Sequence, residues 1–115
     1  HIDYVNRYGD YNNRNLNYTE FQEIIDEILK LLIQKGKGIE INTSGIKYGL
    51  GYVHPKIEIL KRYKQLGGEI ITVGSDAHAP NRIASNFKEA YELLHSVGFQ
   101  AITVFEKQQP RFIDI

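Results

Sequence analysis

The sequence has 115 residues with 14 basic and 14 acidic side chains, enough for one compact domain or a piece of one. Balanced charge without a long basic run argues against a nucleic-acid partner, and the longest apolar-rich stretch, residues 21–33, carries too many charged side chains to span a membrane. The absence of cysteine excludes disulfides and thiolate ligands, so histidine and carboxylate remain as the strong metal ligands.

The chain begins at His1 and contains no methionine, so we expect it to be part of a longer polypeptide. The lack of a signal peptide and of cysteine favours the cytoplasm. We treat residues 1–115 as a single partial domain.

The first predicted elements are a strand end and a long helix. Residues 1–5 alternate in polarity and predict the tip of a strand, which a polar loop over residues 7–15 follows. A capping box at Asn17 or Thr19 begins the helix, and the glycines of residues 36–38 end it. Its apolar face repeats at helical spacing through Phe21, Ile24, Ile25, Ile28, Leu29, Leu31 and Leu32.

Residues 38–42 predict the next strand, with Ile39 and Ile41 on one face and Glu40 and Asn42 on the other. If helices cover the isoleucine face, the polar face looks into a barrel lumen or a cleft at the sheet end, where charged groups need a partner or a metal. A half-exposed edge strand with its glutamate in solvent fits the pattern equally well.

A glycine-rich loop over residues 43–53 follows this strand. Its three glycines and several donors could cradle an anion, although their spacing matches no phosphate-binding fingerprint. Pro55 at a first helical position predicts the second helix, which the glycines at 67–68 end.

The strand over residues 69–73 leads into Gly-Ser-Asp-Ala-His. In extended chain Asp76 and His78 would point to the same side, and a carboxylate beside an imidazole suits Zn, Mn or Fe, or an aspartate that orients an acid–base histidine. Gly74 and Ser75 are small enough to let a ligand approach the backbone. Alternatively, the aspartate caps the following turn and the histidine is a solvated loop residue.

A third helix is predicted to begin at Ser85 or Asn86 and to end at Gly98. Residues 101–105 predict a last strand, and residues 106–115, which include a proline, are expected to pack as a tail.

The alternation of strands and helices predicts an α/β fold with a parallel sheet and right-handed crossovers. Active sites of such sheets lie at the carboxyl ends of the strands. Residues 1–3, the loop after Asn42, and Asp76 with His78 all fall at this predicted rim.

Three motifs, taken together and in this order, resemble the PHP-type histidinol-phosphatases of histidine biosynthesis: His-Ile-Asp-Tyr-Val, Glu-Ile-Asn-Thr-Ser-Gly and Gly-Ser-Asp-Ala-His-Ala-Pro. The resemblance runs from His1 to the tail around Arg111 and corresponds to roughly the C-terminal half of that family's domain. It implies about half of a distorted TIM-like barrel of seven βα units. It also implies a hydrolase that converts histidinol phosphate to histidinol and phosphate with a multinuclear cluster of divalent metals, Zn, Mn or Fe.

By this resemblance, His1, Asp76 and His78 are expected to be metal ligands, the latter two also acting in catalysis. Glu40 and Asn42 match a run that we place beside the metals or the substrate.

Two further substrate contacts are expected from the resemblance. Lys47 stands where an arginine is common and would meet the phosphate as a point charge. His54 would donate a proton or contact the phosphate, or else cap the helix at Pro55.

The sequence departs from the family because it contains no His-x-His pair, which would lie upstream of His1. Three candidate ligands are fewer than a catalytic site of this kind needs, so we expect the complete protein to be the phosphatase and this piece alone to be inactive. The expected partner is a small phosphate monoester, with no nucleic acid or membrane, and a homo-oligomer is possible. Another PHP phosphoesterase or a non-catalytic module are the alternatives.

Overall fold

The computed structural model of the chain describes residues 1–8 and 17–115, apart from the side chains of Arg7 and Lys47. The predicted polar loop therefore lies almost entirely outside the described residues. The elements follow one another in the order α1 (Val5–Tyr8), η1 (Tyr18–Glu20), α2 (Gln22–Gln34), β1 (Ile39–Asn42), α3 (Ser44–Lys47), α4 (Ile57–Gln65), β2 (Ile71–Gly74), η2 (Pro80–Arg82), α5 (Phe87–Val97), β3 (Ala101–Glu106) and β4 (Gln109–Asp114).

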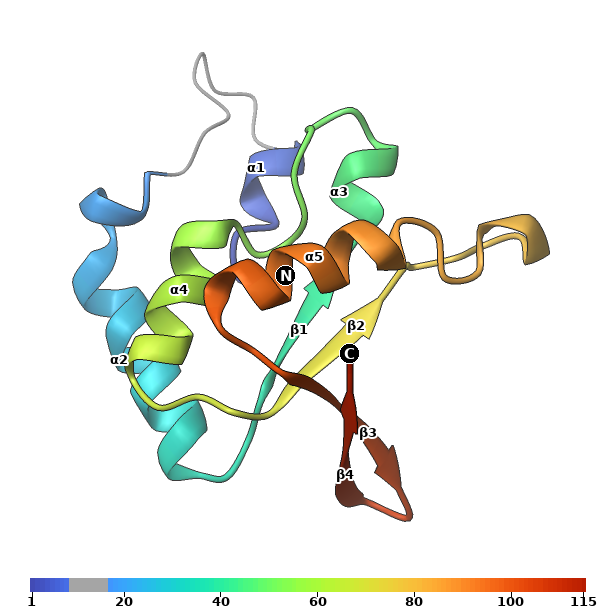
Figure 1. The fold of residues 1–115 in the computed structure, drawn as a ribbon. Coiled ribbons are helices and arrows are strands. Elements are labelled where there is room, and N and C mark those ends of the chain that lie inside the picture. Colours follow the sequence, from blue (N-terminus) through green and yellow to red (C-terminus); the bar gives the residue numbers. More distant parts are fainter. Residues whose placement is uncertain (9–16) are drawn as a thin grey trace.

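The strands β1 and β2 form a parallel pair, which confirms the predicted α/β class (Figure 1). The register runs from Ile39 opposite Ile71 to Asn42 opposite Gly74, so the two carboxyl ends lie level. Just beyond them, the Thr43 N–H donates to the Gly74 carbonyl at 2.9 Å. The polar rim predicted from the sequence therefore exists at this end of the pair.

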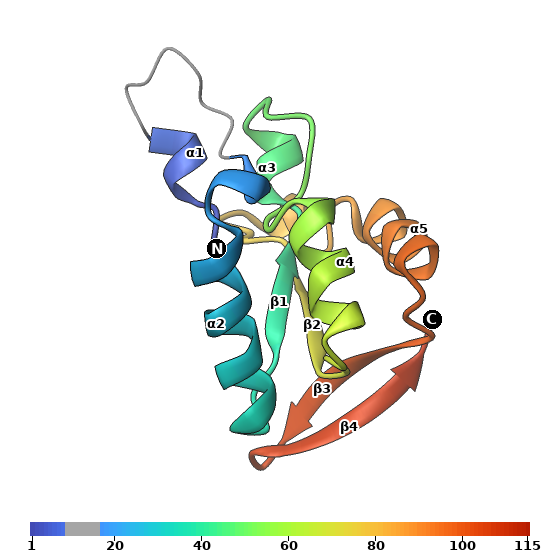
Figure 2. The same ribbon diagram turned by 90° about the vertical axis from the view of Figure 1, so that its left-hand side faces the viewer.

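Three helices pack around the parallel strands, with α4 between α2 and α5 (Figure 2). Of the apolar face predicted for the first helix, Ile25 and Leu29 are buried in the core, whereas Phe21, Ile24, Ile28 and Leu31 are exposed. The buried hydrophobic residues are Ile25, Leu29, Ile39, Ile41, Val53, Ile59, Leu60, Tyr63, Ile71, Ala90, Leu94, Phe99 and Ile102.

An ion pair joins the two helices on one side of this core. The guanidinium of Arg62 on α4 donates three hydrogen bonds of 2.6–3.0 Å to the carboxylate of Asp26 on α2. The hydrogen bonds from Arg62 are the main reason that the pKa of Asp26 is lowered from its ordinary value.

The opposite flank of α2 is apolar and exposed. It consists of Phe21, Ile24, Ile28 and Leu31, which are 40–57% exposed. On an α-helix these positions lie on the side turned away from Asp26, and hence away from α4. We call these four residues the open flank.

The first predicted strand is wrong, because residues 1–4 form a turn that leads into α1. The Tyr4 N–H donates to the His1 carbonyl and the Asn6 N–H to the Asp3 carbonyl, both at 3.1 Å. The Asp3 side chain is buried in contacts with a distant segment, and this competes with extended backbone.

The second helix begins later than predicted. Its first residue is Ile57, Lys56 occupies the N-cap, and Pro55 lies before the helix. The loop before it is also less irregular than expected, because Ser44–Lys47 forms the short helix α3. In the third helix, Asn86 is the N-cap residue, as one of the two predictions had it, but its side chain makes no capping hydrogen bond.

The tail prediction is wrong as well. Residues Gln109–Asp114 form β4, which pairs antiparallel with β3 to make a separate two-stranded sheet. Lys107 and Gln108 both have positive φ, as a tight two-residue hairpin turn requires. Pro110 is accommodated opposite Phe105 because β4 is an edge strand, which does not need every N–H for pairing. The hairpin lies at the end of the molecule opposite the polar rim (Figures 1 and 2).

Candidate active site

His1 and Asp76 meet at the polar rim. The Nε2 atom of His1 lies 3.3 Å from Oδ2 of Asp76, and both side chains are partly exposed, at 35% and 42%. Asp76 follows the end of β2 by two residues and has a left-handed backbone with φ of 46°. Because aspartate tolerates this conformation better than most residues, the chain can turn sharply here and present the carboxylate to His1.

His78 takes a different orientation from the one predicted. The strand ends at Gly74, so the alternation of extended chain does not apply to Asp76 and His78. Instead, Nδ1 of His78 lies 2.7 Å from the backbone carbonyl of Asp76, and the ring is exposed. Donation from Nδ1 leaves the lone pair on Nε2 free to face a ligand.

The polar face of β1 is organised by Asn42. Its amide nitrogen donates to Oε1 of Glu40 at 2.8 Å, and its oxygen accepts the Ser44 N–H at 2.9 Å. Ile39 and Ile41 are buried in the core, so the predicted division of the strand into two faces is confirmed.

Gly74 is required for this arrangement, although for a different neighbour than expected. A β-carbon at this position would lie 2.8 Å from Oε2 of Glu40. The room beside Gly74 is therefore filled by a carboxylate of the protein.

His54 and Asp3 form a buried pair beside the rim. Nδ1 of His54 lies 2.8 Å from Oδ1 of Asp3, and neither side chain is exposed. This burial disfavours the predicted contact of His54 with substrate. His54 does not cap α4 either, because Lys56 is the N-cap residue of that helix and makes no side-chain capping hydrogen bond.

Sequence reasoning did not single out Asp3. In the sequence, Asp3 is marked only as the acidic residue of the His-Ile-Asp motif. Its partner His54 lies 51 residues away, so no local pattern connects the two. Its charge, after the larger effect of burial, also raises the pKa of Tyr52.

Lys47 is the last residue of α3, which follows β1 directly, but its side chain lies outside the described part of the structure. The prediction that it meets a phosphate therefore stays a prediction.

A metal ion fits the chemistry of the rim only in part. An imidazole nitrogen and a carboxylate oxygen are ligands that zinc accepts, but a zinc site takes about four. Within residues 1–8 and 17–115, no group of three or more histidine, cysteine, aspartate or glutamate side chains could hold an ion. His1 and Asp76 would supply two ligands of a site completed elsewhere.

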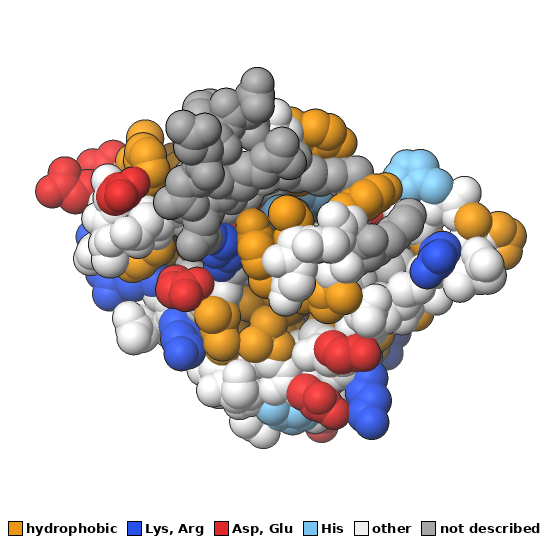
Figure 3. All heavy atoms as spheres, turned by 90° about the horizontal axis from the view of Figure 1, so that it is seen from above, with side chains coloured by type: hydrophobic (Ala, Val, Ile, Leu, Met, Phe, Trp, Pro, Cys, Tyr) orange, Lys and Arg blue, Asp and Glu red, His pale blue; other side chains and the backbone are white. Residues whose placement is uncertain are grey.

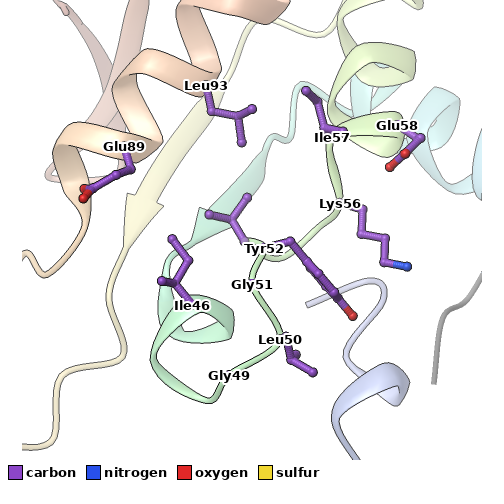
Figure 4. Close-up of a pocket in the computed structure, with 11 residues that line it drawn as sticks. Ile46, Gly49, Leu50, Gly51, Tyr52, Lys56, Ile57, Glu58, Glu89 and Leu93 are labelled. Atoms are coloured by element: carbon purple, nitrogen blue, oxygen red, sulfur yellow. The ribbon is translucent and has the colours of Figure 1, made fainter.

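A hollow of about 750 Å³ lies in a different place, between α3, α4 and α5. Figure 4 shows aliphatic side chains of Ile46, Ile57 and Leu93 around it, with Glu58 and Glu89 on opposite sides. Seen from above, hydrophobic side chains gather in the middle of this face, among charged ones (Figure 3). Neither His1 nor Asp76 lines the pocket, so it is not the candidate active site.

No family model matches the sequence. The chain is 35% identical over 112 residues to a probable histidinol-phosphatase of Clostridium acetobutylicum, 36% over 110 residues to the histidinol-phosphatase of Lactococcus lactis, and 32% over 108 residues to a probable histidinol-phosphatase of Thermotoga maritima. These alignments cover 97%, 91% and 94% of this chain but 43%, 39% and 44% of the relatives. The chain thus spans about two fifths of their length.

The fold matches a crystal structure of the L. lactis histidinol phosphate phosphatase complexed with zinc, L-histidinol and phosphate. The TM-score is 0.80 and the identity 34%, over 96% of this chain and 42% of that one. The resemblance that the three motifs indicated is thereby confirmed. No helix in the described residues is both long and apolar enough to cross a membrane.

Proposed function

We propose that this chain is part of a PHP-type histidinol-phosphatase, and that the complete protein hydrolyses L-histidinol phosphate to L-histidinol and phosphate. The observation that carries the proposal is the contact of His1 with Asp76, because these residues come from two of the three motifs and meet at one rim. The relatives in sequence and fold carry this name, and one of them binds histidinol and phosphate.

We further propose that residues 1–115 are a partial domain, about the C-terminal half of a distorted seven-stranded barrel. The open flank supports this, because four apolar residues on one side of a helix are normally covered.

The free edge of β1 supports the same proposal. The N–H groups of Ile39 and Thr43 bond toward β2, so those of Glu40 and Asn42 face the other edge. At this second edge the Asn42 N–H donates to the His54 carbonyl. Among the described residues, Glu40 pairs with no other strand at the same edge. A parallel strand with one neighbour normally gains a second.

In the complete protein, His1 and Asp76 would bind a divalent metal, and the exposed ring of His78 would have to reorient to join them as a further ligand. Zinc is bound in the L. lactis structure, and manganese and iron accept the same donor types in a multinuclear cluster. When bound, such ions lower the pKa of a coordinated water and screen the charge of a phosphate.

The chain's own residues would prepare the site for this chemistry. The Nε2 lone pair of His1 and the Asp76 carboxylate converge, so they give an ion two fixed directions. If His78 is not a ligand, its Nε2 could carry the proton that the leaving alkoxide needs. Lys47, at the end of α3, would balance the phosphate charge.

Glu40 and Asn42 would shape the floor of the site. The amide of Asn42 has both ends engaged and fixes the carboxylate of Glu40. That carboxylate is partly exposed at the level of Gly74, where it can accept a hydrogen bond from a water or an ammonium group.

The test is phosphate release from L-histidinol phosphate by the complete, metal-loaded protein. We expect turnover that depends on Asp76, with other phosphate monoesters hydrolysed more slowly. Absence of turnover with this substrate would contradict the proposal.

A further inference from the structure

We propose that Asp3 is a positioning residue, whose buried carboxylate fixes the N-terminal turn to the segment around His54 and thereby holds His1 opposite Asp76. The catalytic consequence rests on the proposed function of the rim. The placement of His1 does not, and it can be tested on the 115-residue chain alone.

The carboxylate of Asp3 uses both oxygens. Oδ1 accepts a hydrogen bond from Nδ1 of His54 at 2.8 Å, and Oδ2 accepts the backbone N–H of Lys56 at 2.9 Å. Asp3 is fully buried. A buried carboxylate is costly unless its oxygens are paired, so these two hydrogen bonds select one position for the turn.

The turn that Asp3 fixes is the one that carries His1. The Tyr4 N–H closes it on the His1 carbonyl at 3.1 Å. The His1 ring then rests against the edge of the Tyr4 ring, with centroids 4.5 Å apart, and lies 5.8 Å from the His54 ring at a tilt of 32°. His54 is thus both the partner of Asp3 and a neighbour of the imidazole that Asp3 positions.

The other end of this connection is anchored to the sheet. The backbones of His54 and Asn42 exchange two hydrogen bonds, of 2.6 and 2.9 Å. Asn42 ends β1 and lies opposite Gly74, two residues before Asp76. A continuous series of contacts therefore runs from Asp3 through His54 and the strand ends to the carboxylate that faces His1.

Among the described contacts, those of His1 outside its own turn are with Asp76 and the His54 ring. Its contact with Asp76 is a partly exposed pair at 3.3 Å, and such pairs contribute little by themselves. Full burial also separates Asp3 from a substrate, so we infer that its effect is indirect, through the placement of His1.

The first experiment uses NMR on the 115-residue chain and needs no activity. We expect His54 to carry a proton on Nδ1 at neutral pH and to show a nuclear Overhauser effect to the His1 ring. The substitution Asp3→Asn, which replaces one acceptor by a donor, should abolish or strongly reduce that effect. An unprotonated Nδ1 in the wild-type chain, or an undiminished effect in the variant, would overturn the proposal. The wild-type measurement decides even if the variant does not fold.

The second experiment uses the complete protein and a matched control. Asp26→Asn also removes a largely buried, hydrogen-bonded carboxylate, but one whose partner is Arg62 on α4 rather than His54. We expect Asp3→Asn to weaken zinc binding in a chelator competition, and to lower kcat, by about 10- to 100-fold, as loss of a partner behind a metal ligand typically does. Asp26→Asn should change neither by more than about twofold while still lowering Tm.

Equal effects of the two variants on zinc affinity would show a merely structural role and overturn the positioning role. If the wild-type protein does not hydrolyse histidinol phosphate, the proposed function fails, while the NMR result still decides whether Asp3 places His1.

Discussion

The carboxylate of Glu40 lies against Gly74 so closely that the register of β1 and β2 leaves no room for a β-carbon between them. Gly74→Ala should therefore displace Glu40 from its hydrogen bond with Asn42 and lower the free energy of unfolding by about 0.5–1.5 kcal/mol, the net contribution of one such hydrogen bond. Urea unfolding of the chain measures this. In a Glu40→Ala background the same substitution should cost much less, and equal costs in both backgrounds would contradict the explanation.

Asp76 offers the most direct test of the rim. Asp76→Asn in the complete protein keeps the shape of the side chain but removes the charge that a metal requires. Loss of a residue that supports a metal ligand from behind typically lowers activity by about 10- to 100-fold. We expect Asp76→Asn to lower kcat by more than this, with little change in Tm. Asp114→Asn, an exposed position on β4 at the other end of the molecule, is the matched control. Activity of Asp76→Asn near that of Asp114→Asn would remove Asp76 from the mechanism.

Metal removal tests whether activity at the rim depends on a bound divalent ion. Dialysis of the complete protein against a chelator should abolish phosphate release, and zinc or manganese should restore it, because His1 and Asp76 offer donors that both ions accept. Turnover that persists in chelator would mean that the contact serves another purpose.

The ion pair between Asp26 and Arg62 predicts a pH dependence of stability. The pKa of Asp26 is lowered in the folded state, mainly by hydrogen bonds from Arg62, so the unfolded chain binds more protons in acid. The contribution of Asp26 to the free energy of unfolding is therefore fully present above the ordinary pKa of a carboxylate. It is lost as the pH falls through the lowered pKa of Asp26 in the folded state. Thermal unfolding between about pH 2 and pH 6 should show a shallower acid decline for Asp26→Asn than for the wild type. Parallel curves would be inconsistent with this account.

The open flank of α2 distinguishes a partial domain from a complete one. In the complete protein, Ile24→Glu should destabilise by about 1–3 kcal/mol if the flank is covered there, since a charge would be buried. In the 115-residue chain, where Ile24 is 57% exposed, the effect should be within about 0.5 kcal/mol. Gln34→Glu, at an exposed position of the same helix that is not part of the open flank, is the control in both. Equal behaviour of the two substitutions in the complete protein would argue against a covering segment.

Local sequence patterns were sufficient for the elements that bury an apolar face. The isoleucines of β1 and the buried residues of α2, α4 and α5 repeat with the period of their element, although the predicted face of α2 also included the exposed residues of the open flank. The meeting of His1 with Asp76 was expected from the resemblance and from a strand at residues 1–5, but the structure brings His1 there by a turn before α1 rather than by a strand end.

The failures have a common physical reason. Every residue of β4 is exposed, so no pattern of burial marks it as a strand, and Pro110 argued against one. Residues 1–5 alternate like a strand, but the Asp3 carboxylate finds its partners at His54 and Lys56, which no local pattern can reveal. The same long-range bond buries His54, which the resemblance placed either against the substrate or at the helix cap.

The two-way pairing of Asn42 with His54 has a consequence for changes in loop length. This pairing joins the two ends of residues 43–53, which contain α3 and Lys47. The segment is therefore a loop closed at the end of β1. Lengthening a loop whose ends are already joined costs only about 0.6 kcal/mol for each doubling. Changes in the length of this segment can therefore be absorbed without disturbing the paired ends of β1 and β2.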